Sequence, residues 1–220
     1  MLHLVIANKA YSSWSLRPWM LMTALGIPFE ETVIAMYQPD TKARMLSFGP
    51  TGKCPVLVDG DVTVWESLAI VEYLAETFPD KAVWPRDAKA RAHARAIASE
   101  MHAGFQGLRQ ACPMNLTKRF KTPALTDQIK ADVARLEAMW AGARARFGSG
   151  GPFLLGAFSA ADAMFAPVVT RLDTYQIPVS PETRAYMDTV LGHPAFVLWR
   201  TQAAQETWKI EHYEDGHTPA

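Results

Sequence analysis

The pattern of apolar and polar positions changes character near residue 78. Before it, short apolar runs alternate with stretches in which apolar residues recur every three or four positions. The elements expected there are a strand over Leu2–Ala7, a helix over Ser15–Leu25, a strand over Phe29–Ala35, a helix over Thr41–Ser47, strands over Val56–Val58 and Val62–Val64, and a helix over Ser67–Thr77. Strands joined through helices are expected to pair in parallel, and the final hairpin to add an antiparallel edge. The order βαβαββα thus predicts a mixed four-stranded sheet.

Beyond residue 86 the pattern is helical throughout. The helices expected there cover Asp87–Arg109, Ala124–Phe147, Ser159–Thr174, Ser180–Leu191 and Pro194–Trp208. The polar tail up to Ala220 is expected to be loose. Two prolines interrupt the stretch between the two patterns. We therefore predict an α/β domain over residues 1–78, a linker over 79–86 and an all-helical domain over 87–220.

Composition narrows the class of protein. Hydrophobic residues make up 49% of the 220 residues, enough for a core that needs no disulfide or metal. The net charge is zero and no block of Lys or Arg appears, which argues against binding to nucleic acid or to an anionic membrane surface. Cys54 and Cys112 lie far apart without metal-ligand spacing, and no apolar run is long enough for a signal peptide or a membrane span. A reduced, cytoplasmic protein without a metal is expected.

The hairpin between residues 55 and 67 carries the most informative chemistry. Asp59-Gly60-Asp61 supplies the positive φ angles that a tight turn needs, and Pro55 stands at the start of the first strand. Glu66 and Ser67 follow the second strand and begin a helix. A small peptide can be held at such a place by backbone pairing on one side and by its charged end on the other.

Ser159 and Asp162 form a capping box before an apolar run. Local capping explains both residues without a substrate, so we interpret the pair as structural.

Taken together, these features resemble the glutathione transferase superfamily. The resemblance covers essentially the whole chain and depends on the βαβαββα order, Cys54-Pro55 before a hairpin, Glu66-Ser67 at a helix start, the linker with its prolines, and Ser159-x-x-Asp162 in a helical second domain. It implies a thioredoxin-like first domain with a cis proline at position 55. It also implies glutathione bound in the first domain, an electrophilic co-substrate in a cleft against the second, and a cytosolic homodimer.

The resemblance assigns the peptide-binding residues. The backbone of Cys54, just before Pro55, is expected to pair with the cysteinyl part of glutathione. Glu66 suits the ammonium of the γ-glutamyl end, and Ser67, with the helix N-terminus, suits its carboxylate. Lys53 resembles the residue that reaches the glycyl carboxylate in several classes, and a solvated surface lysine is the alternative.

Activation of the thiol is assigned to the start of the first helix. Tyr11-Ser12-Ser13-Trp14 resembles the Ser-Ser-Cys stretch of zeta-class transferases, which places Ser12 in the catalytic position with Ser13 next to it. Tyr11 is the alternative donor, because a tyrosine serves in other classes. Trp14 stands where zeta members have cysteine, and this departure weakens the inference of maleylacetoacetate isomerase activity. One of the serines is also expected to cap the helix.

Two further residues have mainly structural interpretations. Arg17, one turn into that helix, is expected to form an ion pair with an acid. The thiol of Cys54 is expected to act as a small buried hydrophobe rather than as a redox group.

The co-substrate pocket is expected along the loop at Tyr11 and along the long helix. Its predicted lining residues are Trp14, His102, Phe105, Gln106 and Arg109. An aromatic and a basic group there suit an apolar or an anionic molecule. Gly104 and Gly107 inside the helix are expected to permit close approach of another helix or of a ligand.

The predicted function is conjugation of reduced glutathione to a small electrophilic, apolar substrate through a thiolate that a serine stabilises. Two alternatives stay open, a glutathione-dependent isomerase and a non-catalytic binding or regulatory protein of the same fold.

Overall fold

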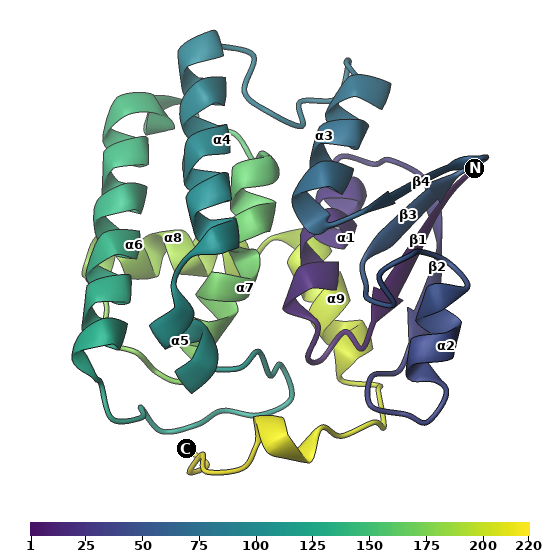
Figure 1. Cartoon of the computed structure of the whole chain (residues 1–220). Helices are drawn as coiled ribbons and strands as arrows, with labels where there is room; N and C mark the ends of the chain where they lie inside the picture. The colour runs from purple at the N-terminus through teal and green to yellow at the C-terminus, as the bar shows by residue number, and fades with distance from the viewer.

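The computed structural model describes residues 1–220 and places a four-stranded sheet beside a larger group of helices (Figure 1). The sheet has the strand order β2-β1-β3-β4. Its strands are β1 (Leu2–Ala7), β2 (Phe29–Ile34), β3 (Val56–Asp59) and β4 (Val62–Trp65). The sheet is mixed and four-stranded, as the apolar pattern predicts.

The direction of β3 corrects one expectation. β1 and β2 pair in parallel, starting with Leu2 opposite Phe29, but β3 runs antiparallel to β1 although a helix connects it to β2. The connecting segment leaves β2 at the end of the sheet where β3 begins, so the chain does not return along the sheet before forming β3. As a result, the start of β3 lies at the same end of the sheet as the end of β1.

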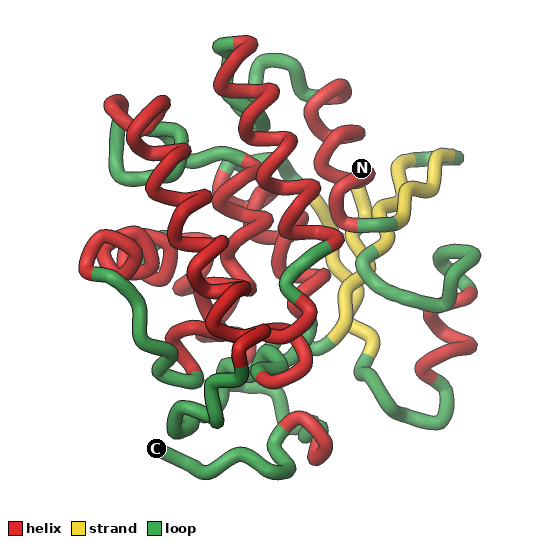
Figure 2. Tube along the Cα trace, turned by 60° about the vertical axis from the view of Figure 1, so that its left-hand side comes forward, coloured by secondary structure: helices red, strands yellow, loops and turns green.

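Nine α-helices complete the fold (Figure 2). They are α1 (Ser13–Ala24), α2 (Thr41–Leu46), α3 (Ser67–Thr77), α4 (Ala88–Ala103), α5 (Gln106–Ala111), α6 (Asp127–Phe147), α7 (Ala160–Thr174), α8 (Pro181–Leu191) and α9 (Pro194–Ala203). Helix α7 is almost entirely buried and packs against α1, α4 and α8. One core cluster includes side chains of both the sheet and the helices, so the two parts are packed together.

The long helix expected over Asp87–Arg109 is two helices. α4 ends at Ala103, Gly104 is extended, and Phe105 adopts a left-handed conformation with φ of +62° before α5 begins. Arg109 of α5 donates to the carbonyl oxygens of Met101 and Gly104, which satisfies acceptors that the end of α4 leaves free. The break turns α5 away from the axis of α4 (Figure 1).

The capping box expected at Ser159 is present. The Asp162 carboxylate accepts from the Ser159 N–H at 2.9 Å, from the Leu154 N–H at 3.1 Å and from the Tyr186 hydroxyl at 3.2 Å. Burial raises the pKa of Asp162 to about 6 despite these donors. The pair is structural, because these contacts join three segments of the helical part. None of the residues involved lines a cavity of the candidate functional site.

The C-terminal tail is packed rather than loose. α9 ends at Ala203, and Ile210 is buried against Ala10 and Tyr11. Pro219 bridges to Phe120, and the Thr218 carbonyl accepts from the Lys121 N–H at 2.8 Å. Residues after α9 therefore cross the molecule and form part of its lower edge in Figure 1.

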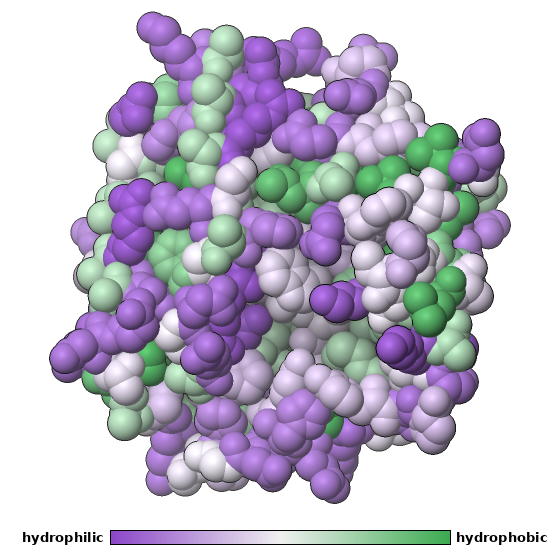
Figure 3. All heavy atoms as spheres, viewed as in Figure 1, coloured by the Kyte–Doolittle hydropathy of each residue, from purple (hydrophilic) through white to green (hydrophobic).

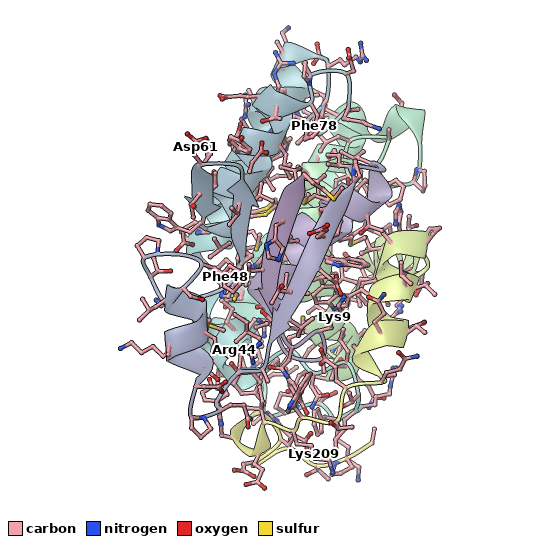
Figure 4. The ribbon with its side chains drawn as sticks, turned by 90° about the vertical axis from the view of Figure 1, so that its right-hand side faces the viewer. Lys9, Arg44, Phe48, Asp61, Phe78 and Lys209 are labelled. Carbon is pink, nitrogen blue, oxygen red and sulfur yellow. The ribbon has the colours of Figure 1, made fainter.

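Lys9 anchors the loop between β1 and α1. Its ammonium donates to Glu31 at 2.7 Å and to Gln202 at 2.7 Å, and the Glu206 carboxylate accepts from its backbone N–H. Figure 4 shows Lys9 between the strands and α9. This buried network joins the sheet to the last helix and fixes the loop that leads to the first turn of α1. No helix combines the length and apolar character needed to cross a bilayer.

Candidate functional site

A cavity of about 270 Å³, here called the hairpin cavity, lies where β3 begins and α3 starts. Its lining residues are Trp14, Thr51, Lys53, Cys54, Pro55, Glu66, Ser67 and His102. All five residues that the sequence assigns to peptide binding are therefore in one cavity. The hairpin brings them together, because β3 and β4 pair from Val56 to Trp65 and so place Pro55 beside Glu66.

The peptide unit at Cys54 offers free hydrogen-bonding groups to this cavity. The bond between Cys54 and Pro55 is cis. Neither the N–H nor the C=O of Cys54 has a hydrogen-bond partner in the chain. Most backbone groups of a folded protein are paired, so a free donor and acceptor on the same residue in a cavity wall suit an extended peptide.

The first turn of α3 offers the hairpin cavity a hydroxyl group and free N–H groups. Ser67 is 1% exposed, and its hydroxyl is buried without a partner. The N–H groups of a helix start are also free and carry partial positive charge. Glu66 precedes them with φ of +68°, an uncommon conformation for a residue other than glycine. This end of α3 can accept a carboxylate, while the Glu66 side chain, 60% exposed, can accept from an ammonium.

Ser12 caps α1 and shares a hydrogen bond with Ser15. Their hydroxyl oxygens are 2.8 Å apart, and the Ser15 hydroxyl also accepts from the Ala7 N–H at 3.0 Å. Either hydroxyl can donate to the other. When Ser15 donates, the Ser12 proton is free to point elsewhere. Ser12 and Cys54 line a second cavity of about 500 Å³ beside the loop after β2, here called the loop cavity, which Lys53 also lines.

Ser13 and Tyr11 face a different cavity from Ser12. The Tyr11 hydroxyl lies 3.3 Å from Glu214 in the C-terminal tail, and burial, followed by the Glu214 charge, raises the pKa of Tyr11. Its hydroxyl is thus oriented toward the tail. Of the three candidates for thiol activation, Ser12 alone lines a cavity together with Cys54.

The cavity that Ser13 and Tyr11 face has a volume of about 470 Å³ and is here called the arginine cavity. Its lining residues are Tyr11, Ser13, Trp14, His102, Gln106, Arg109, Gln110, Pro113, Met114, Arg171, His212 and Tyr213. Trp14 and His102 line the hairpin cavity as well, so the two cavities adjoin. Figure 3 shows mostly hydrophilic side chains over α4 and α5, whereas the most apolar groups of that face lie over α3, the strands and α2.

Four of the five residues expected in the co-substrate pocket line the arginine cavity, and Phe105 is the exception. Phe105 begins the break between α4 and α5, is 8% exposed and packs into the main core. The helical spacing that grouped it with His102 and Arg109 fails because the helix is interrupted there.

The sequence analysis missed six residues of this cavity, Gln110, Pro113, Met114, Arg171, His212 and Tyr213. Arg171 stands within the buried apolar face of α7, where a charged residue is unusual, and that position is a usable signal. His212 and Tyr213 belong to the tail and have no comparable signal, because the path of the tail depends on tertiary packing.

Arg17 does not form the ion pair expected of it. It is 1% exposed, donates to the Met164 carbonyl at 3.1 Å and lies 4.0 Å from the ring centroid of Trp14, with no carboxylate in contact. Burial holds the pKa of Arg17 well below its usual value.

The Cys54 thiol packs against the small cluster around Val5 and Met45, and burial raises its pKa to about 12. A thiol with such a pKa is a poor nucleophile at neutral pH, as expected of a small hydrophobe. No group of three or more His, Cys, Asp and Glu side chains is arranged to hold a metal ion.

Comparison with known families gives two matches to this chain. Residues 11–77 match the family described as Glutathione S-transferase, N-terminal domain, and residues 119–208 match the one described as Glutathione S-transferase, C-terminal domain. The two matches together span more than half of the chain. This chain belongs to the glutathione S-transferase family.

Individual relatives of this glutathione S-transferase family member fall in several classes. A probable maleylacetoacetate isomerase from Caenorhabditis elegans is 39% identical over 103 residues, which make up 44% of this chain and 48% of that protein. Glutathione S-transferase Z2 from Arabidopsis thaliana is 26% identical over 171 residues, or 73% of this chain and 74% of the relative. The chain thus spans about half the length of the first of these relatives.

The fold has close counterparts among solved structures. A glutathione transferase homolog from Burkholderia, crystallised with bound glutathione, superposes with a TM-score of 0.69 at 22% identity, covering 92% of this chain and 97% of that one. This likeness shows the family fold, a thioredoxin-like part followed by a helical part.

Proposed function

We propose that this protein is a glutathione-dependent transferase that joins the sulfur of reduced glutathione to an electrophilic carbon of a small co-substrate. The observation that supports this best is the pair of unsatisfied groups in the hairpin cavity. The buried Ser67 hydroxyl and the Cys54 backbone have no partner in the chain and lie beside the open end of α3. Buried polar groups are nearly always hydrogen-bonded, so these groups suit a polar peptide ligand.

Each polar end of glutathione has a complementary group in the proposed complex. The Ser67 hydroxyl and the α3 N-terminus receive the γ-glutamyl carboxylate, and Glu66 receives its ammonium. The Cys54 N–H and C=O pair with the cysteinyl unit. Lys53, which lines both the hairpin and the loop cavities, reaches the glycyl carboxylate.

Ser12 stabilises the thiolate in this proposal. A free thiol has a pKa of about 8.5, and each unit by which the protein lowers that pKa corresponds to about 1.4 kcal/mol. In the free protein the Ser12 hydroxyl donates to Ser15, which also accepts from the Ala7 N–H. When Ser12 donates to the sulfur instead, the Ser15 hydroxyl can rotate and donate to Ser12 in turn. Such a chain strengthens the last donor because each hydrogen bond polarises the next.

In the conjugation step, the thiolate forms a carbon–sulfur bond with the co-substrate. The leaving group departs with the electron pair of the bond that breaks, and the thiol proton has already passed to solvent. The protein positions the two reactants and stabilises the anion.

The alternative is a glutathione-dependent isomerase, which the similarity to a probable maleylacetoacetate isomerase favours. There the same thiolate adds to an unsaturated carbon, the resulting single bond rotates, and the thiolate leaves with no net change in atoms. Trp14 in the place of the zeta-class cysteine favours the transferase reading.

Retention on immobilised glutathione, followed by a conjugation assay with 1-chloro-2,4-dinitrobenzene, tests the proposal. Retention, turnover above the uncatalysed rate and loss of turnover in Ser12→Ala are expected. Retention without turnover by the wild type, on this arene or on an activated alkene, instead indicates a binding or regulatory protein. Absence of both retention and turnover contradicts the proposal.

Assembly as a homodimer is a further part of the proposal, taken from the family resemblance. Sedimentation velocity is expected to give twice the mass of one chain, and a monomer over the whole micromolar range contradicts this part alone.

A further inference from the structure

Three arginine side chains lie close to one another at and beside the arginine cavity without an acidic partner. Arg17 comes from α1, Arg109 from α5 and Arg171 from α7, and none of them forms a salt bridge, although ten other pairs in the chain do. Arg109 and Arg171 line the cavity, and Arg17 lies behind them. Such a group of cations is unusual, because buried charges are normally paired.

The hydrogen bonds of the three side chains leave several donors free. Arg171, 7% exposed, donates to the Cys112 carbonyl at 2.6 Å and to no other acceptor. Arg109 uses two of its nitrogens at the end of α4, and its third nitrogen has no acceptor. One terminal nitrogen of Arg17 is buried without a partner. The two arginines that line the cavity therefore carry guanidinium donors with nothing in the chain to receive them.

Neighbouring carboxylates are already engaged elsewhere. Asp132, the nearest acid to Arg109, accepts from the Leu108 N–H at 3.0 Å and from the Gln128 amide at 3.0 Å. Glu214 accepts from Lys118 and lies in hydrogen-bond range of the Tyr11 hydroxyl.

The electrostatic effect of this arrangement is visible on all three cations. Burial, together with the repulsion from Arg109 and Arg171, lowers the pKa of Arg17, and burial lowers those of Arg109 and Arg171 too. An anion in the cavity offsets both effects, since it pairs with the two guanidinium groups that line the cavity and screens the charge of the third.

We propose that the co-substrate carries a carboxylate, and that Arg109 and Arg171 bind this carboxylate in the arginine cavity. This inference rests on the proposed function and names its substrate class. Of the apolar and the anionic molecules that the sequence analysis left open for this pocket, it selects the anionic one, in place of the apolar substrate of the predicted function. Trp14 and His102 belong to both cavities, so a molecule held at the arginines extends toward the hairpin cavity, where glutathione is proposed to bind.

Two matched aryl chlorides test the charge preference. The rates of conjugation of 4-chloro-3-nitrobenzoate and 4-chloro-3-nitrobenzamide are each divided by their uncatalysed rates with glutathione. In both, a carbon–sulfur bond forms and chloride leaves with its electron pair. The carboxylate is expected to be favoured in kcat/KM by about tenfold or more, the size of a charge-assisted hydrogen bond. A ratio near one, or a preference for the amide, overturns the proposal.

Variants of Arg171 test whether the arginines cause the preference for the carboxylate over the amide. Arg171→Gln is expected to lose most of the preference, and Arg171→Lys, which keeps the charge and is the safer change in a buried site, to keep part of it. Arg146→Gln is the control, because Arg146 is exposed on α6 and outside all three cavities. If Arg171→Gln and the control keep equal preference, the arginine cavity does not bind the carboxylate.

A binding measurement separates this inference from the proposed function. Calorimetry with 3-nitrobenzoate, which has no leaving group, is expected to show binding at least tenfold tighter than with 3-nitrobenzamide, whether or not glutathione turnover occurs. Equal affinities contradict the anion site even if conjugation is efficient. Preference for the benzoate in a protein that neither binds nor uses glutathione supports the anion site and contradicts the proposed function.

Discussion

The hydroxyl oxygens of Ser12 and Ser15 lie 2.8 Å apart at the start of α1, and the Ser15 hydroxyl accepts from the Ala7 N–H at the end of β1. The sheet is thereby connected by hydrogen bonds to the residue proposed to stabilise the thiolate. Ser12 is also the N-cap of α1, since its oxygen accepts from the Ser15 N–H. Capping and catalysis are compatible here because the cap uses the oxygen lone pairs and leaves the proton available.

The first prediction concerns this pair. Ser15→Ala removes the hydrogen-bond partner of the Ser12 hydroxyl and leaves the Ala7 N–H without its acceptor. We expect kcat/KM to fall about fivefold and the apparent pKa of the bound thiol to rise, since a hydrogen bond of about 1 kcal/mol is lost. The pH profile of kcat/KM measures both. Ser13→Ala is the control, and a larger pKa rise in Ser13→Ala than in Ser15→Ala assigns the thiol to Ser13 instead.

The second prediction separates binding from stability at Ser67. Its hydroxyl has no partner in the free chain, so Ser67→Ala is expected to leave the free energy of unfolding unchanged or slightly raised. Glutathione affinity is expected to fall about tenfold, because the carboxylate loses a donor. Denaturant titration and calorimetry give the two quantities.

Ser180→Ala provides the contrasting variant. The Ser180 hydroxyl accepts from the Thr183 N–H at 3.2 Å and caps α8, far from the hairpin cavity. Ser180→Ala is expected to lower the free energy of unfolding by about 1 kcal/mol without changing the affinity for glutathione. If Ser67→Ala behaves like Ser180→Ala, the Ser67 hydroxyl is structural.

The third prediction is a pH dependence. Burial raises the pKa of Cys54 to about 12, so the neutral thiol dominates and about one molecule in ten thousand carries the thiolate at pH 8. Alkylation by iodoacetamide is therefore expected to be slow and to rise tenfold per pH unit from 7 to 9 without a plateau. Mass spectrometry of the modified peptide follows the rate. A plateau below pH 9 indicates that the pKa of Cys54 is lowered and favours a redox role for its thiol.

The fourth prediction tests the packing that positions α5. A Cβ at Gly107 would lie 2.6 Å from the Gln128 side chain and 3.1 Å from Asp132, so α6 approaches α5 too closely for a larger residue. Gly107→Ala is expected to lose about 1–3 kcal/mol of stability. Gly142→Ala, where a Cβ meets nothing within 4 Å inside α6, is expected to gain about 0.5–1 kcal/mol. Urea unfolding measures the free energy of unfolding of both variants. Equal changes contradict the close approach of α6 to α5 at Gly107.

Features set by neighbouring residues were predictable from the sequence. The Asp59-Gly60-Asp61 turn, the Ser159–Asp162 capping box and the start of α3 at Ser67 all depend on local backbone preferences. The hairpin cavity was predictable for the same reason, because one turn of known type brings Pro55 beside Glu66.

Features that depend on contacts between residues far apart in the chain were not predictable from the sequence. Phe105, at the break between α4 and α5, is buried in a core built from both parts of the chain. The isolation of Arg17 from any acid is visible only when α1, α5 and α7 are packed together.

The sequence by itself determined the order of the elements apart from the break between α4 and α5, the turn and caps between them, and the clustering of the candidate peptide-binding residues within the 15 residues from Lys53 to Ser67. Only the tertiary structure decided the direction of β3, the path of the C-terminal tail and the positive charge of the arginine cavity. The physical reason is how far apart in the sequence the interacting residues lie. Hydrogen bonds in turns and caps join residues a few positions apart, whereas Arg17 and Arg171 are brought together by hydrophobic packing of helices far apart in the chain, which has no local pattern.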